Sequence, residues 1–186
     1  WKQGMLLCEV YGSTESTPHL YVPPEQALRL NGTVSGRPVE GVEVRVVNAQ
    51  GQEAAPGEEG EELSRGPNVF VGYTKRDASL AALDEDGWFH SGDLCVRRDD
   101  GFFRITGRKK DVILRGGETL HAAQLEENLQ GCPQLLEHAV IGMPDSRMGE
   151  RICACVVLKP EIEAFSLKEL ISYLQEKQIP KWQWPE

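Results

Sequence analysis

The sequence predicts an α+β fold, in which a glycine-rich, β-barrel-like subdomain is followed by a small α+β C-terminal domain. From residue 33 to about 105, short runs of alternating apolar and polar residues are separated by glycine-rich turns, a texture typical of a strongly bent sheet or small barrel. Beyond Gly107 the spacing of apolar residues becomes helical, and two runs rich in Val, Ile and Cys indicate further strands. This change predicts two domains, 1–107 and 108–186.

In the first domain, residues 4–10 are a short apolar run, which predicts a buried strand leading into a polar loop at 11–15. Valines alternate with charged residues over 42–46, so a strand is expected there, followed by a turn at 48–51. A second strand is expected to return over 61–65.

In the second domain, two leucines spaced four residues apart predict a helix over 122–130. Strands are predicted over 138–143 and 152–158. Ser166 and Glu169 have the spacing of a capping box, which opens a last helix. The predicted apolar face of that helix consists of Leu167, Leu170, Ile171 and Leu174.

The composition is that of an ordinary soluble protein: 186 residues, 40% hydrophobic and 26% charged. A formal net charge of −9 argues against nucleic acid or an anionic membrane as partner, and no run approaches the ~18 apolar residues of a transmembrane segment. The first residues lack both an initiator Met and a secretory signal, and the last six are rich in aromatic and apolar side chains. Both ends are therefore expected to lie within a longer protein.

The five cysteines include no C-x-x-C pair. Cys153 and Cys155 alternate in an apolar run, where one strand face would bury both, as small hydrophobic residues in a reducing compartment. This interpretation predicts a cytoplasmic protein, while a zinc site or a disulfide framework remains the alternative. The four histidines have no metal-ligand spacing, so no transition metal is expected.

Two polar segments have the composition of a nucleotide site. Within residues 11–15, Tyr11 offers a face for stacking, a hydroxyl group suits a phosphate, and Glu15 suits Mg²⁺. Asp93, beside Gly92 in what is expected to be a tight turn, suits two sugar hydroxyls. Each segment also has an ordinary interpretation, a polar turn after a strand and an Asp that stabilises its own turn.

A third segment, residues 107–111, supplies several cations after a glycine. It suits either a solvated basic surface or a loop that binds phosphate or ribose.

Taken in order, these segments resemble the adenylate-forming superfamily of acyl- and aryl-CoA synthetases, luciferases and peptide-synthetase adenylation domains. The resemblance runs over essentially the whole chain. Its motifs are Tyr11-Gly-Ser-Thr-Glu15, Gly60-Glu-Glu-Leu63 continuing to Gly72-Tyr73, Gly87-Trp-Phe-His-Ser-Gly-Asp-Leu94, and Gly107-Arg-Lys-Lys-Asp111 with Arg115-Gly-Gly-Glu118. The phrasing at 64–70 and 91–95 is similar to bacterial short- and medium-chain fatty-acyl-CoA ligases.

The resemblance implies a role for each matching residue. Tyr11 would stack on adenine, Thr14 would contact the α-phosphate, and Glu15 would position Mg²⁺. Asp93 would bind the ribose hydroxyls, with Arg108 on the same sugar. The remaining residues so assigned are Gly12 in the nucleotide-binding loop, Lys110 at the hinge between two domains, and Gly117 on the path of the pantetheine arm of coenzyme A.

The implied reaction has two steps. A carboxylic acid, expected to be a short- or medium-chain fatty acid, attacks the α-phosphorus of ATP to give an acyl-adenylate and pyrophosphate. The thiol of coenzyme A then displaces AMP and forms the thioester. ATP, Mg²⁺ and coenzyme A are thus the implied cofactors and co-substrates of an acid–thiol ligase.

The match departs from the family in three places. Nothing in the chain resembles the family's Ser/Thr/Gly-rich phosphate loop with its lysine, and Lys181 comes too early to match the lysine near the family's C-terminus. After Glu118, Thr119, Ala122 and Gln124 stand where relatives have Asn, Pro and Glu. The chain alone is therefore expected to be inactive. A non-catalytic nucleotide-binding or interaction module is the alternative.

Overall fold

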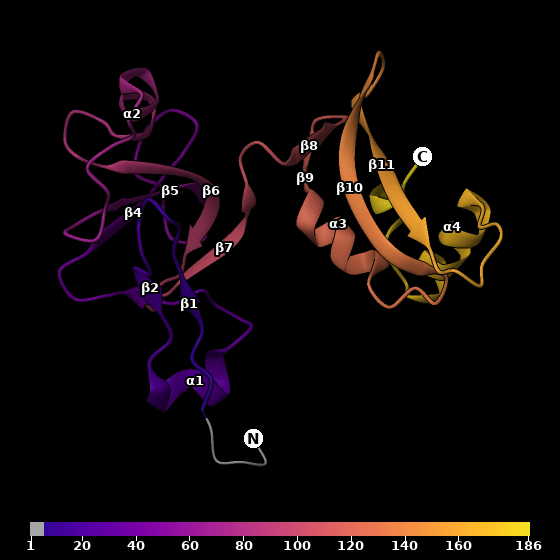
Figure 1. The fold of residues 1–186 in the computed structure, drawn as a ribbon, viewed down its shortest axis with the longest axis horizontal. Helices are drawn as coiled ribbons and strands as arrows, with labels where there is room; N and C mark the ends of the chain where they lie inside the picture. Colours follow the sequence, from indigo (N-terminus) through magenta and orange to yellow (C-terminus); the bar gives the residue numbers. More distant parts are fainter. Residues whose placement is uncertain (1–5) are drawn as a thin grey trace. The chain divides into compact units, whose positions relative to one another are not determined.

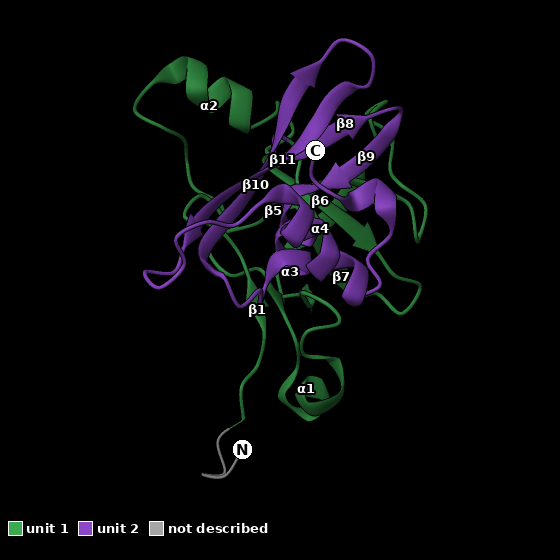
Figure 2. Ribbon diagram, turned by 90° about the vertical axis from the view of Figure 1, so that its right-hand side faces the viewer, with its two compact units in different colours: residues 1–109 green, residues 110–186 purple. Residues whose placement is uncertain are grey.

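The chain forms two compact units, 1–109 and 110–186, of which the computed structural model describes residues 6–186 (Figure 2). Each unit combines helices with antiparallel strands, so the α+β class is confirmed (Figure 1). Among the described residues, no helix is long and apolar enough to cross a membrane.

The first unit contains a small sheet in the order β1-β2-β3 and a larger sheet in the order β4-β5-β6-β7. The strands are β1 (Val10–Tyr11), β2 (Leu20–Tyr21), β3 (Arg37–Pro38), β4 (Glu43–Val47), β5 (Glu59–Arg65), β6 (Phe89–Arg97) and β7 (Phe103–Arg108). Two short helices, α1 (Pro24–Leu30) and α2 (Arg76–Ala82), lie in the connections.

The two sheets share a core but do not close into a barrel, which corrects the barrel-like prediction. Strands β4 and β7 are the edges of the larger sheet, and closure would require them to pair. The small sheet instead supplies Leu20, which packs in one cluster with Val46, Cys95 and Phe103 of the larger sheet. The glycine-rich turns therefore accompany two small, open sheets.

The predicted buried strand over 4–10 is wrong for the residues that the structure describes. Strand β1 begins only at Val10, and the side chains of Leu6, Leu7 and Val10 are 44%, 73% and 57% exposed. Residues 4 and 5 lie outside the described residues. An apolar run predicts burial only when another part of the fold covers it, and this stretch is not covered by the described structure.

The sequence gives little sign of the two helices of the first unit. Helix α2 buries none of its residues, so it lacks the periodic apolar face by which helices are found. Helix α1 is seven residues long and begins with a proline at its first position, with Ala27 and Leu30 buried. Both helices are too short for their periodicity to be distinguished from a loop.

The second unit is a four-stranded antiparallel sheet in the order β10-β11-β8-β9 with two helices. Its elements are β8 (Val112–Arg115), β9 (Glu118–His121), α3 (Ala122–Leu129), β10 (Leu135–Asp145), β11 (Gly149–Leu158), α4 (Leu167–Glu176) and the 3₁₀ turn η1 (Lys181–Gln183). The predicted helix at 122–130 and the predicted strands at 138–143 and 152–158 are confirmed, the strands being longer than expected.

One apolar core joins the sheet and both helices of this unit. Its fully buried members include Ile113 of β8, Ile152 of β11, Leu129 of α3 and Leu174 of α4. The capping box at the start of α4 is also confirmed: Glu169 N donates to Ser166 Oγ at 3.3 Å, and Ser166 N donates to Glu169 Oε2 at 2.8 Å. Leu170 and Leu174 point into the core, whereas Leu167, predicted on the same face, is 46% exposed.

The predicted burial of Cys153 and Cys155 is wrong. Cys155 is exposed and Cys153 is only partly covered, because the side chains that enter the core from β11 are those of its other face, including Ile152. The opposite face carries exposed residues on the paired strand too, such as Ile141 beside Cys153. All five cysteines are free thiols, and only Cys95 and Cys132 are buried.

Replacement of Leu174 by Ala is expected to lower the free energy of unfolding of the second unit by about 2–5 kcal/mol, because the side chain is 1% exposed and leaves a cavity. Leu167→Ala, the same change in the same helix, is expected to cost less than about 1 kcal/mol. Urea unfolding monitored by hydrogen exchange of peptides from this unit measures both. Equal losses would contradict the observed orientation of α4.

Candidate functional site

Tyr11 is held by its hydroxyl group. The residue lies in β1, partly buried, and its hydroxyl donates to Asp93 Oδ2 of β6 at 2.6 Å. Burial, followed by the nearby charge of Glu62 and the hydrogen bond to Asp93, raises the pKa of Tyr11 far above its usual value. The hydroxyl therefore stays protonated and acts as a donor, and the ring is fixed at one end.

Asp93 lies in a bulge of strand β6 and not in a tight turn, which corrects the expectation from sequence. Between the pairs Glu61–Leu94 and Leu63–His90, β6 advances four residues while β5 advances two. Gly92 has a φ of +71°, a conformation in which a glycine is favoured. The bulge is closed by a hydrogen bond from Asp93 N to Ser91 Oγ at 3.0 Å. It turns the carboxylate of Asp93, only 7% exposed, toward Tyr11.

Arg108 is the direct neighbour of Asp93 across strands β6 and β7. Its Nε lies 3.0 Å from Asp93 Oδ1, an ion pair. The two groups are not aligned for a hydrogen bond, so Oδ1 is a buried oxygen without a hydrogen-bond partner in the described part of the chain. The structure thus brings Tyr11, Asp93 and Arg108 together and leaves one carboxylate oxygen able to accept from a hydroxyl group.

The loop after Tyr11 needs a glycine at position 12. A Cβ at Gly12 would lie 2.6 Å from the Cα of Pro18, because the loop folds back on itself. The fold-back is stabilised by a hydrogen bond from Ser13 N to Ser16 O at 2.8 Å. Thr14 is exposed at this loop, where its hydroxyl is accessible from solvent.

Glu15 is anchored by Tyr73, which belongs to one of the quoted motifs but was given no role from the sequence. The hydroxyl of Tyr73 donates to Glu15 Oε1 at 2.8 Å, and this hydrogen bond lowers the pKa of the Glu15 carboxyl. Glu15 is therefore ionised at neutral pH. Among the described residues, no group of three or more His, Cys, Asp and Glu side chains is placed to hold a metal ion.

A buried polar cluster lies behind Tyr11 and was also missed. His19 and Glu62 are 1% and 0% exposed and form an ion pair at 3.1 Å. Two hydroxyl groups, of Ser16 and Ser64, extend the cluster. The adjacent acids Glu61 and Glu62 in a predicted strand were the available signal, because side chains alternate along a strand and one of the two had to point inward.

In the second unit, Gly117 lies in the turn between β8 and β9, and Lys110 is exposed at the first position of the unit. Gly117 has a φ of +89°, and a Cβ there would meet no atom within 4 Å. The glycine is thus explained by its backbone conformation. Lys110 and Gly117 thus belong to the second compact unit, and Tyr11, Asp93 and Arg108 to the first.

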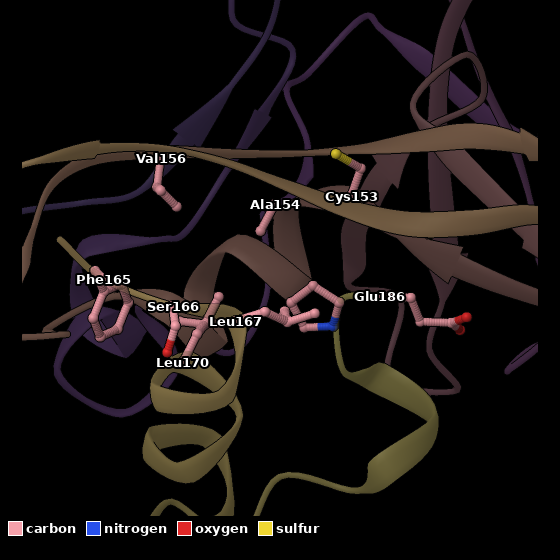
Figure 3. Close-up of a pocket in the computed structure, with 9 residues that line it drawn as sticks. Cys153, Ala154, Val156, Phe165, Ser166, Leu167, Leu170 and Glu186 are labelled. Carbon is pink, nitrogen blue, oxygen red and sulfur yellow. The ribbon is translucent and has the colours of Figure 1, made fainter.

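In the second unit, a hollow of about 240 Å³ opens beside β11 and the start of α4 (Figure 3). Figure 3 shows Val156, Ala154 and Cys153 on one wall, with Phe165 and Leu170 across from them. Its lining is mainly apolar, and none of the residues to which the resemblance assigns a role lies among those that line it.

Comparison with known families gives two matches along the chain. A model described as AMP-binding enzyme matches residues 2–74, and a model described as AMP-binding enzyme C-terminal domain matches residues 124–186. The first match contains the motifs at 11–15 and 60–73, and the motifs at 87–94 and 107–118 lie between the two matches. The chain belongs to the AMP-binding enzyme family. The resemblance inferred from the sequence is confirmed.

Two curated relatives illustrate the range of this family. The medium-chain fatty-acid–CoA ligase of Escherichia coli K12 is 44% identical over 186 residues, which is 100% of this chain and 33% of the relative. The salicyl-AMP ligase/salicyl-S-ArCP synthetase of Mycobacterium tuberculosis is 46% identical over 147 residues, which is 77% of this chain and 26% of the relative. The chain thus spans about a third or less of the length of these AMP-binding enzymes.

A solved structure supports the same fold. The o-succinylbenzoate CoA synthetase of Bacillus subtilis, in complex with an acyl-adenylate intermediate, matches with a TM-score of 0.84 at 29% identity, covering 99% of this chain and 37% of that one. A second structure of that enzyme contains ATP and a magnesium ion. The AMP-binding fold therefore extends over both units of the chain.

Tyr11→Phe is expected to lower the free energy of unfolding of the first unit by about 1–3 kcal/mol, because the buried Asp93 loses its donor. Tyr73→Phe removes a similar tyrosine–carboxylate hydrogen bond at an exposed position, so a change within about 0.5 kcal/mol is expected. Urea unfolding monitored by hydrogen exchange in the first unit compares them. A Tyr11→Phe protein as stable as Tyr73→Phe would refute the importance of this contact.

Proposed function

We propose that this chain acts as part of an ATP-dependent, AMP-forming acyl-CoA ligase. In the proposed reaction, a carboxylate attacks the α-phosphorus of ATP to form an acyl-adenylate and pyrophosphate, and the thiol of coenzyme A then displaces AMP. A carboxylate is a poor electrophile at neutral pH, and the mixed anhydride provides it with a good leaving group. The role of the protein is mainly to position the reactants and to neutralise charge.

The observation that carries the proposal is the arrangement of Tyr11, Asp93 and Arg108. Asp93 Oδ2 is satisfied by the Tyr11 hydroxyl, whereas Oδ1 is buried and lacks a hydrogen-bond partner within residues 6–186. A ribose hydroxyl would satisfy Oδ1, with the guanidinium of Arg108 beside the same oxygen. The partly exposed ring of Tyr11 then offers a face to the adenine.

The loop next to Tyr11 is proposed to receive the phosphates. Gly12 permits the tight fold-back, and Thr14 presents an exposed hydroxyl that suits the α-phosphate. Glu15 is proposed to hold Mg²⁺ as one carboxylate, with phosphate oxygens and water as the other ligands, as is usual for this ion. The hydrogen bond from Tyr73 keeps the carboxylate ionised and fixed in position for that role.

Residues 1–107 are proposed to be the C-terminal part of the large AMP-binding domain and residues 108–186 a small C-terminal domain, a boundary two residues before that between the compact units. Lys110, where the second compact unit begins, is proposed as the hinge. Gly117 is proposed to line the path of the pantetheine arm of coenzyme A, where its lack of a side chain leaves room.

A short- or medium-chain fatty acid is the proposed acyl substrate. It is supported by the 44% identity to a medium-chain fatty-acid–CoA ligase over the whole chain. Relatives named for salicylate and o-succinylbenzoate make aromatic acids the competing class. Comparison of octanoate with salicylate in a ligase assay of the whole enzyme separates the two classes, and preference for salicylate would overturn the fatty-acid proposal.

Asp93→Asn is expected to weaken the binding of AMP by about tenfold or more, because the ribose hydroxyls and Arg108 lose the charged acceptor. Isothermal titration calorimetry of the chain with AMP measures the loss. Asp100→Asn is the matched control, since Asp100 also pairs with an arginine, Arg98, but lies on an exposed turn. AMP affinity that is the same in both variants would rule out the proposed ribose site.

The chain alone is expected to release no AMP above background from ATP, octanoate and coenzyme A. None of its residues matches the phosphate-loop lysine of the resembling family, so the β- and γ-phosphates lack their cation. A coupled assay for AMP checks this, with the Asp93→Asn chain as the blank. AMP release by the wild-type chain, absent from the variant, would contradict the expectation while supporting the nucleotide site.

A further inference from the structure

The first unit buries a histidine and a carboxylate against one another. His19, just before β2, is 1% exposed, and Glu62 of β5 is 0% exposed, with His19 Nε2 3.1 Å from Glu62 Oε1. Placing two such groups out of water is unfavourable unless they are paired, and even a paired site often stabilises no better than apolar residues would. A contribution to stability is therefore a weak explanation for this pair.

Small polar side chains orient the imidazole of His19. Its Nδ1 lies 3.1 Å from Ser16 Oγ, which in turn lies 3.1 Å from Ser64 Oγ and accepts from Asn68 Nδ2 at 3.2 Å. Both ring nitrogens of His19 thus have partners. The ring is held in one plane and cannot turn without breaking this chain of contacts.

The oriented imidazole supports the ring of Tyr11. The two rings meet edge to face, with centroids 5.1 Å apart and planes at 72°. The hydroxyl of Tyr11 is fixed by Asp93 at the opposite end. Tyr11 is therefore positioned by two contacts, one at its ring from His19 and one at its oxygen from Asp93.

The groups that face His19 favour its charged form. Burial lowers the pKa of His19, but the hydrogen bond and charge of Glu62, with backbone carbonyls of Ser16 and Thr17, more than offset this and raise it above 6.5. The other titratable neighbours stay neutral: the pKa of Tyr11 is raised by burial, and that of Cys95 to about 12. Beyond Tyr11, Asp93 is paired with Arg108.

Protonation of His19 stabilises the folded chain, and this stabilisation depends on pH. The folded chain binds the proton of His19 more tightly than the unfolded chain does, so the resulting stabilisation is present below about pH 6.5 and is lost as the pH rises through the raised pKa of His19. Deprotonation leaves Glu62 buried, with Oε2 already lacking a partner among the described residues. The pair is then expected to rearrange.

We propose that the buried His19–Glu62 pair positions Tyr11 for the nucleotide, so that the affinity of the site for AMP falls when His19 gives up its proton. This inference rests on the proposed function and adds regulation of the same site by pH. His19 and Glu62 act through Tyr11 and are positioning residues, since neither is exposed to touch a ligand.

The test measures AMP affinity by calorimetry between about pH 6 and 9, the range in which histidine switches are found. The wild-type chain is expected to lose affinity by about fivefold or more over this range, whereas Glu62→Gln and His19→Gln are expected to have a flatter profile. His90→Gln is the matched control, a partly exposed histidine of the same unit. The phosphate of AMP itself titrates near pH 6 and changes the affinity of every variant alike. The result is therefore the difference in pH dependence between each variant and the wild-type chain.

Each single variant leaves one buried polar group unpaired, which can prevent folding. A double variant, His19→Leu with Glu62→Leu, avoids this, because buried ion pairs can be replaced by apolar residues of similar volume. The double variant is expected to fold and to bind AMP with an affinity that changes little between about pH 6 and 9. A profile as steep as that of the wild type in either the double variant or Glu62→Gln would overturn the inference.

Aromatic NMR separates this inference from the proposed function. The ring signals of Tyr11, identified by their loss in Tyr11→Phe, are expected to shift with the titration of His19 in the free chain. If AMP fails to bind the wild-type chain at any pH, the proposed function fails, and the NMR titration still decides whether the pair positions Tyr11. Tyr11 ring signals whose chemical shifts do not change as His19 titrates would overturn the positioning role.

Discussion

The hydrogen bond from Tyr11 to Asp93 joins the two sheets of the first unit at the point where Tyr11, Asp93 and Arg108 meet. It connects β1 of the small sheet with β6 of the larger one, across 82 residues of sequence. The bond forms because a bulge at Gly92 turns Asp93 out of the regular alternation of β6. Arg108 reaches the same carboxylate as a direct neighbour on β7. Because Asp93 is only 7% exposed and is contacted from both β1 and β7, the bond constrains the positions of Tyr11, Asp93 and Arg108 relative to one another.

The two units are stabilised in different ways. The second has one continuous apolar core, to which strands and both helices contribute, and its sheet leaves its other face exposed. Within residues 6–109, the first has three smaller apolar clusters. It also has a polar interior in which Ser16, His19, Glu62 and Ser64 are buried in contact with one another. Such an interior is stable only while each polar group keeps its partners, which couples the geometry near Tyr11 to protonation.

Much of the second unit followed from the sequence, because its elements are regular. Leucines at helical spacing and a capping box located α3 and α4, and apolar runs located β10 and β11. The exposed face of the β10–β11 hairpin was mispredicted at Cys155, since β-branched and small apolar residues occur on both of its faces. In the first unit, α2 was missed because it buries nothing, and Leu7 was expected inside because it is apolar.

The sequence by itself determined the family, the α+β class and the identity of the candidate residues, because these depend on local motifs and their order. Only the tertiary structure decided how those residues are held. The bulge at Asp93 depends on the register between strands β5 and β6. The hydrogen bond of Tyr73 to Glu15 and the burial of His19 against Glu62 depend on contacts between residues 58 and 43 positions apart in the sequence. A shift of one residue in that register would turn Glu62 to the opposite face, and no local pattern specifies it.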